Sequence, residues 1–217
     1  MCAPMAQYPV LLNLSGRLCV VVGGGEVAER KIDALLACAA RVRAIAPSFA
    51  AGIEAAAAQG NAELRRRAYR EGDLAGALLA IAATDDAAVN QAVWREAMGR
   101  GILVNVVDDP ARCTFTLPAT VRRGSFLLTV STEGASPALA RAVRERLEEE
   151  FGPEYAVFTA WLGELRARVK SLYPEQQARE RVWQSIVRSD ALERLRRGDD
   201  QGARDTVEAI IGAGAGA

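Results

Sequence analysis

Short apolar runs alternate with helical patterns over the first half of the chain. Most of the runs are rich in Val, Ile, Leu and Ala, and their alternation with helices is typical of an α/β fold with a mostly parallel, doubly wound sheet. The predicted strands cover residues 18–22, 41–46, 62–68, 78–83 and 102–107, and the predicted helices cover residues 27–38, 50–59 and 89–98. The polar third strand is expected near a sheet edge. The sequence therefore predicts a Rossmann-like domain.

The pattern changes after the fifth predicted strand. Two alternating runs, residues 115–121 and 126–132, are separated by residues 122–125 and predict a β-hairpin. Ser136 and Pro137 then combine a preferred N-cap residue with a proline at the first helical position. They predict a helix that extends to about residue 151.

From residue 153 onward the chain is expected to be helical, because apolar residues recur at helical spacing. Residues 212–217 are expected to fray. The large apolar side chains are expected in a core rather than around a ligand; they include Tyr155, Phe158, Trp161, Leu162, Leu165, Val169, Leu172, Val182, Trp183, Ile186 and Val187. The predicted division is a Rossmann domain over residues 1–112, a hairpin-plus-helix dimerisation region over 113–151 and a helical domain over 152–217.

Three glycines join the first predicted strand to the first predicted helix. Gly23 permits a tight turn, Gly24 follows it, and Gly25 lets the backbone approach a pyrophosphate at the N-terminus of the helix. Ala28 holds the third position of the Gly-x-Gly-x-x-Gly fingerprint and is small enough for close packing. The pattern predicts a dinucleotide-binding βαβ unit; the alternative is a glycine-rich turn in another kind of α/β domain.

Charge and composition exclude several classes of function. The 27 Lys and Arg residues balance 27 Asp and Glu residues, so no net charge favours nucleic acid or a membrane surface. No apolar run approaches the roughly 18 residues that a membrane span needs. The first residues lack the pattern of a secretory signal. We therefore expect a cytoplasmic protein without nucleic-acid or membrane partners.

Histidine is absent from the chain, which excludes His-based triads, bases and metal ligands. Acid–base chemistry near neutral pH must then use a carboxylate, Lys, Tyr or Cys. The four cysteines, Cys2, Cys19, Cys38 and Cys113, lack zinc-type spacing and indicate a reducing compartment. No metal site is expected.

The end of the second strand bears on the choice of cofactor. NAD sites usually carry Asp or Glu there, about 20 residues after the glycines, and NADP sites carry Arg. Here the chain reads Ala46-Pro47-Ser48, with no Arg at positions 47–50. We expect NAD, with backbone groups and Ser48 at the ribose.

Several ordered blocks resemble the precorrin-2 dehydrogenase family, the small sirohaem-synthase enzymes and the N-terminal half of fused sirohaem synthases. The resemblance covers about residues 8–150. The blocks are Gly23-Gly24-Gly25-Glu26-Val27-Ala28-Glu29-Arg30-Lys31, Ala82-Ala83-Thr84-Asp85-Asp86 with Asn90, Asn105-Val106-Val107-Asp108-Asp109-Pro110, Phe115 with Pro118-Ala119, and Ser131-Thr132-Glu133-Gly134-Ala135-Ser136-Pro137.

This resemblance implies a reaction. Precorrin-2, a tetrapyrrole with eight carboxylates, loses a hydride to NAD and a proton, which gives sirohydrochlorin. Some family members also insert ferrous ion, and whether this chain does so, or accepts cobaltous ion, stays open. The family implies a homodimer built by the hairpin and the following helix. The methyltransferase domain of the fused enzymes is missing from this sequence, so we do not expect it to make precorrin-2.

The family also implies roles for particular residues. The catalytic aspartate falls on Asp108, although Asp108 and Asp109 also suit a turn before Pro110. Thr132 stands where some members have a functional serine, and its added methyl puts that role in doubt. Glu26 and Val27 should contact the cofactor beside the glycines, Pro47 and Ser48 the ribose, and Thr84 and Asn105 the same crevice. Arg122, Arg123, Arg141 and Arg144 are candidates for holding substrate carboxylates.

A regulatory Rossmann module that senses NAD without catalysis is the alternative function. Asp108 and the hairpin favour the enzyme, since a sensor needs neither. A short-chain dehydrogenase is disfavoured, because the sequence has no Tyr-x-x-x-Lys pair to supply the acid.

Overall fold

The computed structural model describes residues 6–213, which form two compact units. The N-terminal unit comprises residues 8–117. The C-terminal unit comprises residues 118–213 together with residues 6 and 7. Each unit has its own hydrophobic core, and each is described separately below.

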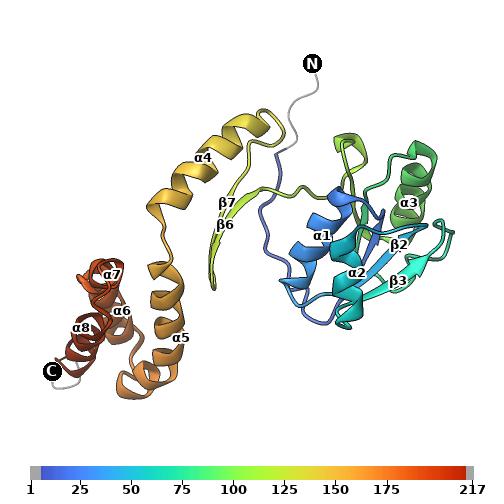
Figure 1. Cartoon of the computed structure of the whole chain (residues 1–217). Coiled ribbons are helices and arrows are strands. Elements are labelled where there is room, and N and C mark those ends of the chain that lie inside the picture. The colour runs from blue at the N-terminus through green and yellow to red at the C-terminus, as the bar shows by residue number, and fades with distance from the viewer. Residues whose placement is uncertain (1–5, 214–217) are drawn as a thin grey trace. The chain divides into compact units, whose positions relative to one another are not determined.

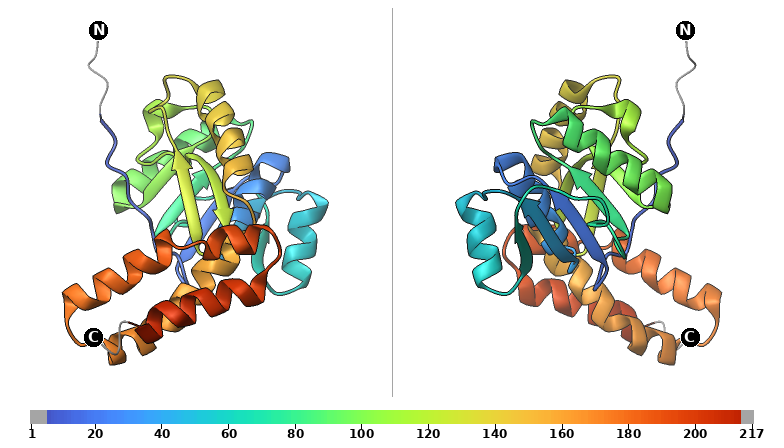
Figure 2. Two further views of the ribbon diagram at one scale, coloured as in Figure 1. Left: turned by 90° about the vertical axis from the view of Figure 1, so that its left-hand side faces the viewer. Right: turned by 90° about the vertical axis from the view of Figure 1, so that its right-hand side faces the viewer.

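A five-stranded parallel sheet forms the centre of the N-terminal unit. Its strand order is β3-β2-β1-β4-β5, with every neighbouring pair parallel. The strands are β1 (Leu18–Val22), β2 (Arg41–Ala46), β3 (Ala62–Arg66), β4 (Leu79–Ala82) and β5 (Leu103–Val106). Helices α1 (Glu26–Leu36) and α2 (Ala51–Ala58) cover one face, and α3 (Ala87–Arg100) covers the other (Figures 1 and 2). The predicted doubly wound fold is confirmed.

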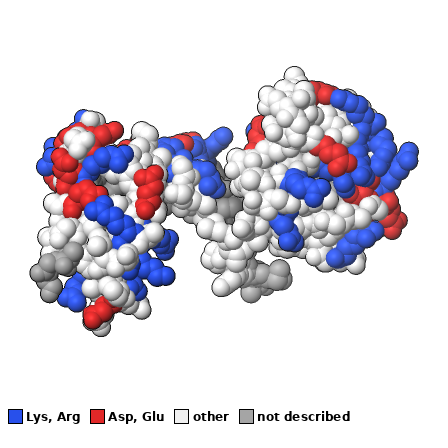
Figure 3. Space-filling model, turned by 90° about the horizontal axis from the view of Figure 1, so that it is seen from below, with Lys and Arg blue, Asp and Glu red and all other residues white. Residues whose placement is uncertain are grey.

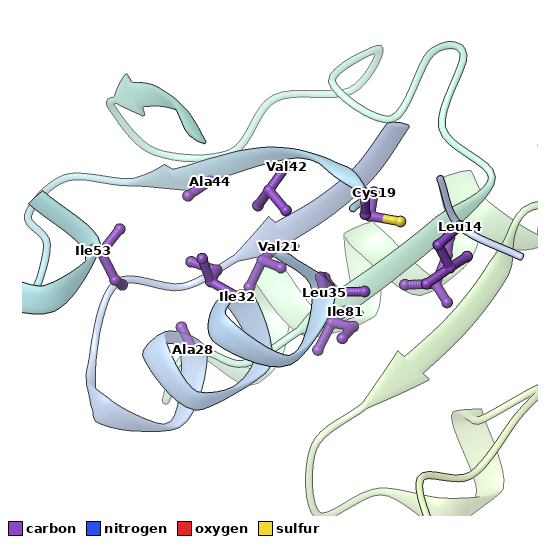
Figure 4. Packing of buried hydrophobic residues seen from close by; sticks show 12 residues of the cluster. Leu14, Cys19, Val21, Ala28, Ile32, Leu35, Val42, Ala44, Ile53 and Ile81 are labelled. Atoms are coloured by element: carbon purple, nitrogen blue, oxygen red, sulfur yellow. The ribbon is translucent and has the colours of Figure 1, made fainter. Parts of the chain in front are cut away.

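Both faces of the sheet are buried because alternate side chains of each strand point to opposite sides. On β1, Cys19 and Val21 join α1 and α2 in one cluster, which includes the fully buried Ile32 and Ile53 (Figure 4). Val20 and Val22, the alternate residues of β1, pack on the other face with Val93 and Ala97 of α3. Because helices cover both faces of the sheet, β1 has to be apolar along its whole length, as its sequence is.

Local signals set the ends of α3. The Asp86 carboxylate accepts hydrogen bonds from the Ala88 and Val89 amides at 2.8 and 3.2 Å, which satisfies two of the free N–H groups at the start of the helix. At the other end Gly101 has φ +68° and the Ile102 amide donates to the Ala97 carbonyl. A left-handed glycine is the usual C-terminal stop of a helix.

The strands of the hairpin have different limits from the predicted ones, 115–121 and 126–132. β6 covers Ala119–Arg123 and β7 covers Phe126–Val130, joined by a two-residue turn at Gly124, where φ is +58°. Arg122 and Arg123 thus belong to a strand. Residues 115–118 lie outside it, because Thr114 is hydrogen-bonded to β5 and Pro118 has no N–H to give to a ladder.

Helices make up the rest of the C-terminal unit. Ser136 caps α4 (Pro137–Glu150), as predicted, by accepting a hydrogen bond from the Leu139 amide at 3.2 Å. The remaining helices are α5 (Glu154–Leu172), α6 (Gln176–Arg188), α7 (Ala191–Arg196) and α8 (Asp200–Ala213). Their core contains most of the predicted aromatic and aliphatic residues. Residues 212 and 213 are helical rather than frayed, and residues 214–217 lie outside the described part.

Aromatic rings connect the hairpin to the helices. The ring centroid of Phe126 on β7 lies 5.5 Å from that of Phe151 and 4.8 Å from that of Tyr155. Arg123 on β6 donates to the carbonyls of Glu148 and Phe151, at 3.1 and 3.0 Å, and so caps the C-terminal end of α4. Hairpin, α4 and the start of α5 therefore share one set of contacts.

A nearly buried carboxylate fixes the chain after β3. The side chain of Asp73 is 5% exposed and accepts hydrogen bonds from Arg65 at 2.9 Å, from Arg67 at 2.7 and 2.6 Å, and from the Arg70 amide at 2.8 Å. Chiefly because of the hydrogen bonds from Arg67, the pKa of Asp73 is lowered to about 2. The turn from β3 toward β4 depends on this charge.

We expect Asp73→Asn to weaken the N-terminal unit by about 2 kcal/mol at pH 6. Because the pKa of the folded state lies below that of the unfolded chain, the contribution is complete above about pH 5 and disappears as the pH falls from about 4 to 2. Urea unfolding of wild type and variant at pH 6 and pH 2.5 measures the difference. Asp33→Asn, an exposed carboxylate on α1, is the control. An Asp73 effect of equal size at both pH values would contradict the assignment.

Candidate active site

The glycine loop lies at the carboxyl ends of the central strands. Gly23 follows β1, its amide donates to the Ile45 carbonyl of β2 at 2.9 Å, and the Gly24 carbonyl accepts from the Ala50 amide at 2.7 Å. Parallel α/β sheets bind ligands at this edge, where the strand order reverses between β1 and β4. The loop therefore occupies the expected position of a dinucleotide site.

The three glycines of the loop differ in the space that surrounds them. A Cβ built on Gly23 would lie 2.2 Å from the Ala83 carbonyl oxygen, and one on Gly24 would lie 1.9 Å from the Ser48 carbonyl oxygen. Both positions exclude any side chain because backbone fills the space. A Cβ on Gly25 would meet no atom within 4 Å. Gly25 thus leaves open space at the start of α1, which suits the approach of a pyrophosphate.

The N-terminus of α1 is free to bind an anion. Gly25 is its N-cap residue and supplies no side-chain hydrogen bond. The amides of the first turn, which begins with Glu26 and Val27, have no acceptor within the helix. Together with the helix dipole they form a site for phosphate oxygens. These residues fit a bound dinucleotide cofactor.

Two further predicted contacts lie at neighbouring strand ends. Pro47 and Ser48 follow β2 and are exposed. After β4, the Thr84 hydroxyl lies 2.8 Å from the Asn90 amide oxygen, and the Asn90 amide nitrogen donates to the Thr84 carbonyl at 2.8 Å. Thr84 is therefore held to α3, and these hydrogen bonds fix the turn after β4.

Asp108 follows β5 in an unusual backbone conformation. Its φ is +60°, in the left-handed region that non-glycine residues adopt rarely and Asp tolerates better than most. Its side chain is exposed, and within residues 6–213 no hydrogen bond or ion pair involves its carboxylate. Asp109, by contrast, pairs with Arg112 at 2.7 Å. Asp108 is therefore the free carboxylate of this turn.

The chain after Asp108 folds back along β5 and supports the turn. The Cys113 thiol lies 3.3 Å from the Val106 carbonyl oxygen and 3.2 Å from the Asp109 carbonyl oxygen. The Asn105 amide donates to the Phe115 carbonyl at 3.1 Å and to the Cys113 sulfur at 3.4 Å. Burial raises the pKa of Cys113, so the thiol stays protonated and can donate.

These contacts give two residues roles that their sequence pattern does not indicate. Asn105, expected at the cofactor, uses its amide nitrogen to hold residues 113–115. Cys113 has no motif around it, and its contacts exist only because the chain reverses direction after β5. An isolated cysteine carries no sequence signal for such a role.

Thr132, the second predicted catalytic residue, belongs to the C-terminal unit. It follows β7, and its hydroxyl oxygen accepts a hydrogen bond from the Ser136 amide at 3.0 Å. The adjacent residues Glu133 and Gly134 both have positive φ. The Thr132 hydroxyl thus helps to form the tight turn that leads into α4.

Residues 6–213 contain no candidate metal cluster and no candidate membrane-spanning helix. In this range no three Cys, Asp or Glu side chains gather closely enough to hold a metal ion. Within the same range no helix combines the length and apolar character needed to cross a membrane. On the face shown in Figure 3, basic and acidic side chains are intermingled.

Three known families match consecutive parts of the chain. Residues 10–119 match a family described as putative NAD(P)-binding, residues 128–150 match the sirohaem biosynthesis protein central family, and residues 154–211 match the sirohaem synthase dimerisation region. The first match covers the whole parallel sheet and the glycine loop.

Individual relatives agree with these matches. Sirohaem synthases of Pseudomonas aeruginosa (strain LESB58) and Chromobacterium violaceum are 40% and 38% identical to the chain, each over 97% of it and 45% of the relative. The chain thus spans about half the length of these curated relatives. The solved structure of SirC, a precorrin-2 dehydrogenase, is 29% identical with a TM-score of 0.77, over 94% of this chain and all of that one.

The fold and the glycine loop define a Rossmann protein of the NAD(P)-binding class. Within this class, the order of the three family matches and the similarity to the individual relatives indicate one family. The chain belongs to the precorrin-2 dehydrogenase and sirohaem synthase family.

We expect Gly25→Ala and Gly24→Ala to separate cofactor binding from stability. Gly25→Ala has room and an ordinary φ of −86°, so it should fold normally but weaken NADH binding by about tenfold or more, because its methyl occupies the pyrophosphate approach. Gly24→Ala should destabilise the unit by about 2 kcal/mol or more through its clash with Ser48. NADH fluorescence titration and thermal unfolding measure the two effects. Equal NADH affinity in Gly25→Ala and wild type would refute the loop assignment.

Proposed function

We propose that the chain is a precorrin-2 dehydrogenase that oxidises precorrin-2 to sirohydrochlorin with NAD. The N-terminal unit supports this with a glycine loop open to a dinucleotide and a free carboxylate after β5, at the same edge of the sheet. The similarity to SirC supports it as well, because the alignment covers the full length of that dehydrogenase. The similarity to the longer sirohaem synthases covers less than half of each.

In the proposed reaction, precorrin-2 and NAD⁺ give sirohydrochlorin, NADH and a proton. NAD, when bound, supplies the hydride acceptor. The carboxylate of Asp108 accepts the departing proton and releases it to water. The observation that carries this assignment is the exposed, unpaired state of Asp108 at the carboxyl end of β5. A chain without histidine needs such a group for proton transfer.

Substrate carboxylates need cations, and the four candidate arginines differ in availability. Arg123 is used at the end of α4, and Arg144 pairs with Glu145 and Glu148. Arg141 is largely exposed, 3.8 Å from Glu145. No ion pair of the described residues involves Arg122. We propose Arg122 and Arg141 as the substrate ligands among the four.

We further propose that the chain is a homodimer. The match to a dimerisation region over residues 154–211 supports this, together with apolar side chains that the C-terminal unit leaves exposed. They are Leu139, Val157, Leu172 and Val187. The hairpin and α4, predicted to dimerise from the family resemblance, remain part of this proposal, as does the division into regions 1–112, 113–151 and 152–217.

Two carboxylates of one turn test the catalytic role. Asp108→Asn should lower kcat about 10² to 10⁴-fold while NADH binding is unchanged, because only the proton acceptor is lost. Asp109→Asn is the matched control; its amide oxygen can still accept from Arg112, so turnover should stay within about threefold. The assay follows sirohydrochlorin and NADH absorbance together in anaerobic mixtures of enzyme, precorrin-2 and NAD.

The same assay distinguishes the alternatives. If wild type binds NADH but turns over no precorrin-2, the enzyme proposal fails and an NAD-sensing role takes its place. Full activity in Asp108→Asn would leave the dehydrogenase but remove Asp108 from its mechanism. Ferrous or cobaltous ion added to the product tests metal insertion, the activity that the family resemblance leaves open, and Thr132→Ala tests whether the Thr132 hydroxyl takes part in it.

Sedimentation velocity tests the proposed dimer. We expect a species of about 46 kDa at micromolar concentration, twice the 23.1 kDa of one chain. Val187→Lys, which places a charge on an exposed apolar position of α6, should shift the population toward monomer. A wild-type monomer at this concentration would contradict the proposal.

A further inference from the structure

The expected preference for NAD over NADP has no explanation at the position that usually determines it. The end of β2 carries neither an acid for the ribose hydroxyl nor an arginine for a 2′-phosphate. The structure offers another source of discrimination between NAD and NADP, the side chain of Glu29 on α1.

Glu29 lies one turn beyond the glycine loop, and its amide donates to the Gly25 carbonyl at 3.0 Å. Its half-buried side chain points toward the first turn of α2. A Cβ built on Gly52, the second residue of that helix, would lie 2.3 Å from Glu29 Oε1 and 3.2 Å from Oε2. The carboxylate therefore sits against the α2 N-terminus.

This N-terminus is next to the cofactor loop. The Ala50 amide donates to the Gly24 carbonyl, and the Ser48 carbonyl packs against Gly24. Ala50 is the N-cap of α2 and provides no side-chain hydrogen bond. A bare helix N-terminus beside the ribose position would attract the 2′-phosphate of NADP. The negative charge of Glu29 opposes that attraction.

The cation in this region is neutralised as well. Arg66 lies over the Phe49 ring, 5.6 Å from its centroid, in the loop that follows β2. Both terminal nitrogens of its guanidinium are bound by the two carboxylate oxygens of Glu54. Arg66 is thus held in an ion pair instead of presenting an unpaired charge to a phosphate.

We propose that Glu29 is a specificity-determining residue that excludes the 2′-phosphate of NADP, with Glu54 assisting by sequestering Arg66. The negative charge is supplied from α1, whereas the usual acid comes from the end of β2. The Glu29 carboxylate repels the 2′-phosphate of NADP, which carries about two negative charges. NAD has a neutral hydroxyl at the same position, so its binding is little affected. The inference rests on the proposed use of a dinucleotide and is independent of the oxidation step.

Binding of NADH and NADPH to the full chain, followed by nicotinamide fluorescence, tests this directly. Wild type should bind NADH at least tenfold more tightly than NADPH. Glu29→Gln, which keeps the size of the side chain, should tighten NADPH binding at least fivefold and change NADH binding less than twofold. Asp33→Asn, one turn further along α1, removes an equal charge and should change neither affinity.

A second variant keeps the test informative if Glu29→Gln unfolds. Glu54→Ala removes both acceptors of Arg66 and should also tighten NADPH binding selectively. Raised salt should reduce the discrimination of wild type between NADH and NADPH. Equal affinities of wild type for the two cofactors, or variants that change both affinities in parallel, would overturn the proposal. Failure to bind either cofactor would refute dinucleotide use itself, whereas normal selectivity without precorrin-2 turnover would refute only the enzyme assignment.

Discussion

The close approach of three backbone segments around Gly23 and Gly24 is the constraint on which the N-terminal unit depends. The turn after β1 packs directly on the carbonyl groups of Ala83 and Ser48, which follow β4 and β2. Any side chain at these two glycines would push the neighbouring strand ends apart. The same contacts that close the sheet edge therefore also orient the amides at the start of α1. The same backbone contacts thus stabilise the fold and shape the candidate cofactor site.

This arrangement explains how the remaining functional groups are placed. Because all five strands are parallel, their carboxyl ends meet at one edge, and the turns after β2, β4 and β5 place Ser48, Thr84 and Asp108 at the same sheet edge as the glycine loop. Each turn is fixed by its own hydrogen bonds, from Asn90 in one case and from the Cys113 segment in another. The sheet edge around the glycine loop is thus shaped largely by contacts between backbone segments.

Periodicity predicted the strands and helices well because β1, β2 and β4 are largely buried on both sides and read as apolar runs, whereas the polar β3 lies at the sheet edge. The limits of sequence reasoning are equally physical. The predicted start of the first hairpin strand, residue 115, was wrong because residues 113–115 are hydrogen-bonded to β5. This contact joins segments about ten residues apart, and no local pattern reveals it. The glycine loop carried a local signal, whereas the proximity of Glu29 to Gly52 depends on how two helices pack. Position in a motif is readable from sequence; packing between elements is not.

At Asp108, which has a left-handed backbone conformation, the residue that suits stability and the residue that suits the proposed chemistry are different. Glycine adopts this conformation without strain but adds freedom to the unfolded chain, so exchanging Asp for Gly at this position alters stability by no more than about 1 kcal/mol. Selection for a folded protein alone would thus accept the loss of the carboxylate. In the proposed mechanism, it is selection for turnover that maintains the carboxylate. Variant libraries sorted by thermal stability would therefore let this position drift, and the same libraries sorted by growth that requires the product would not.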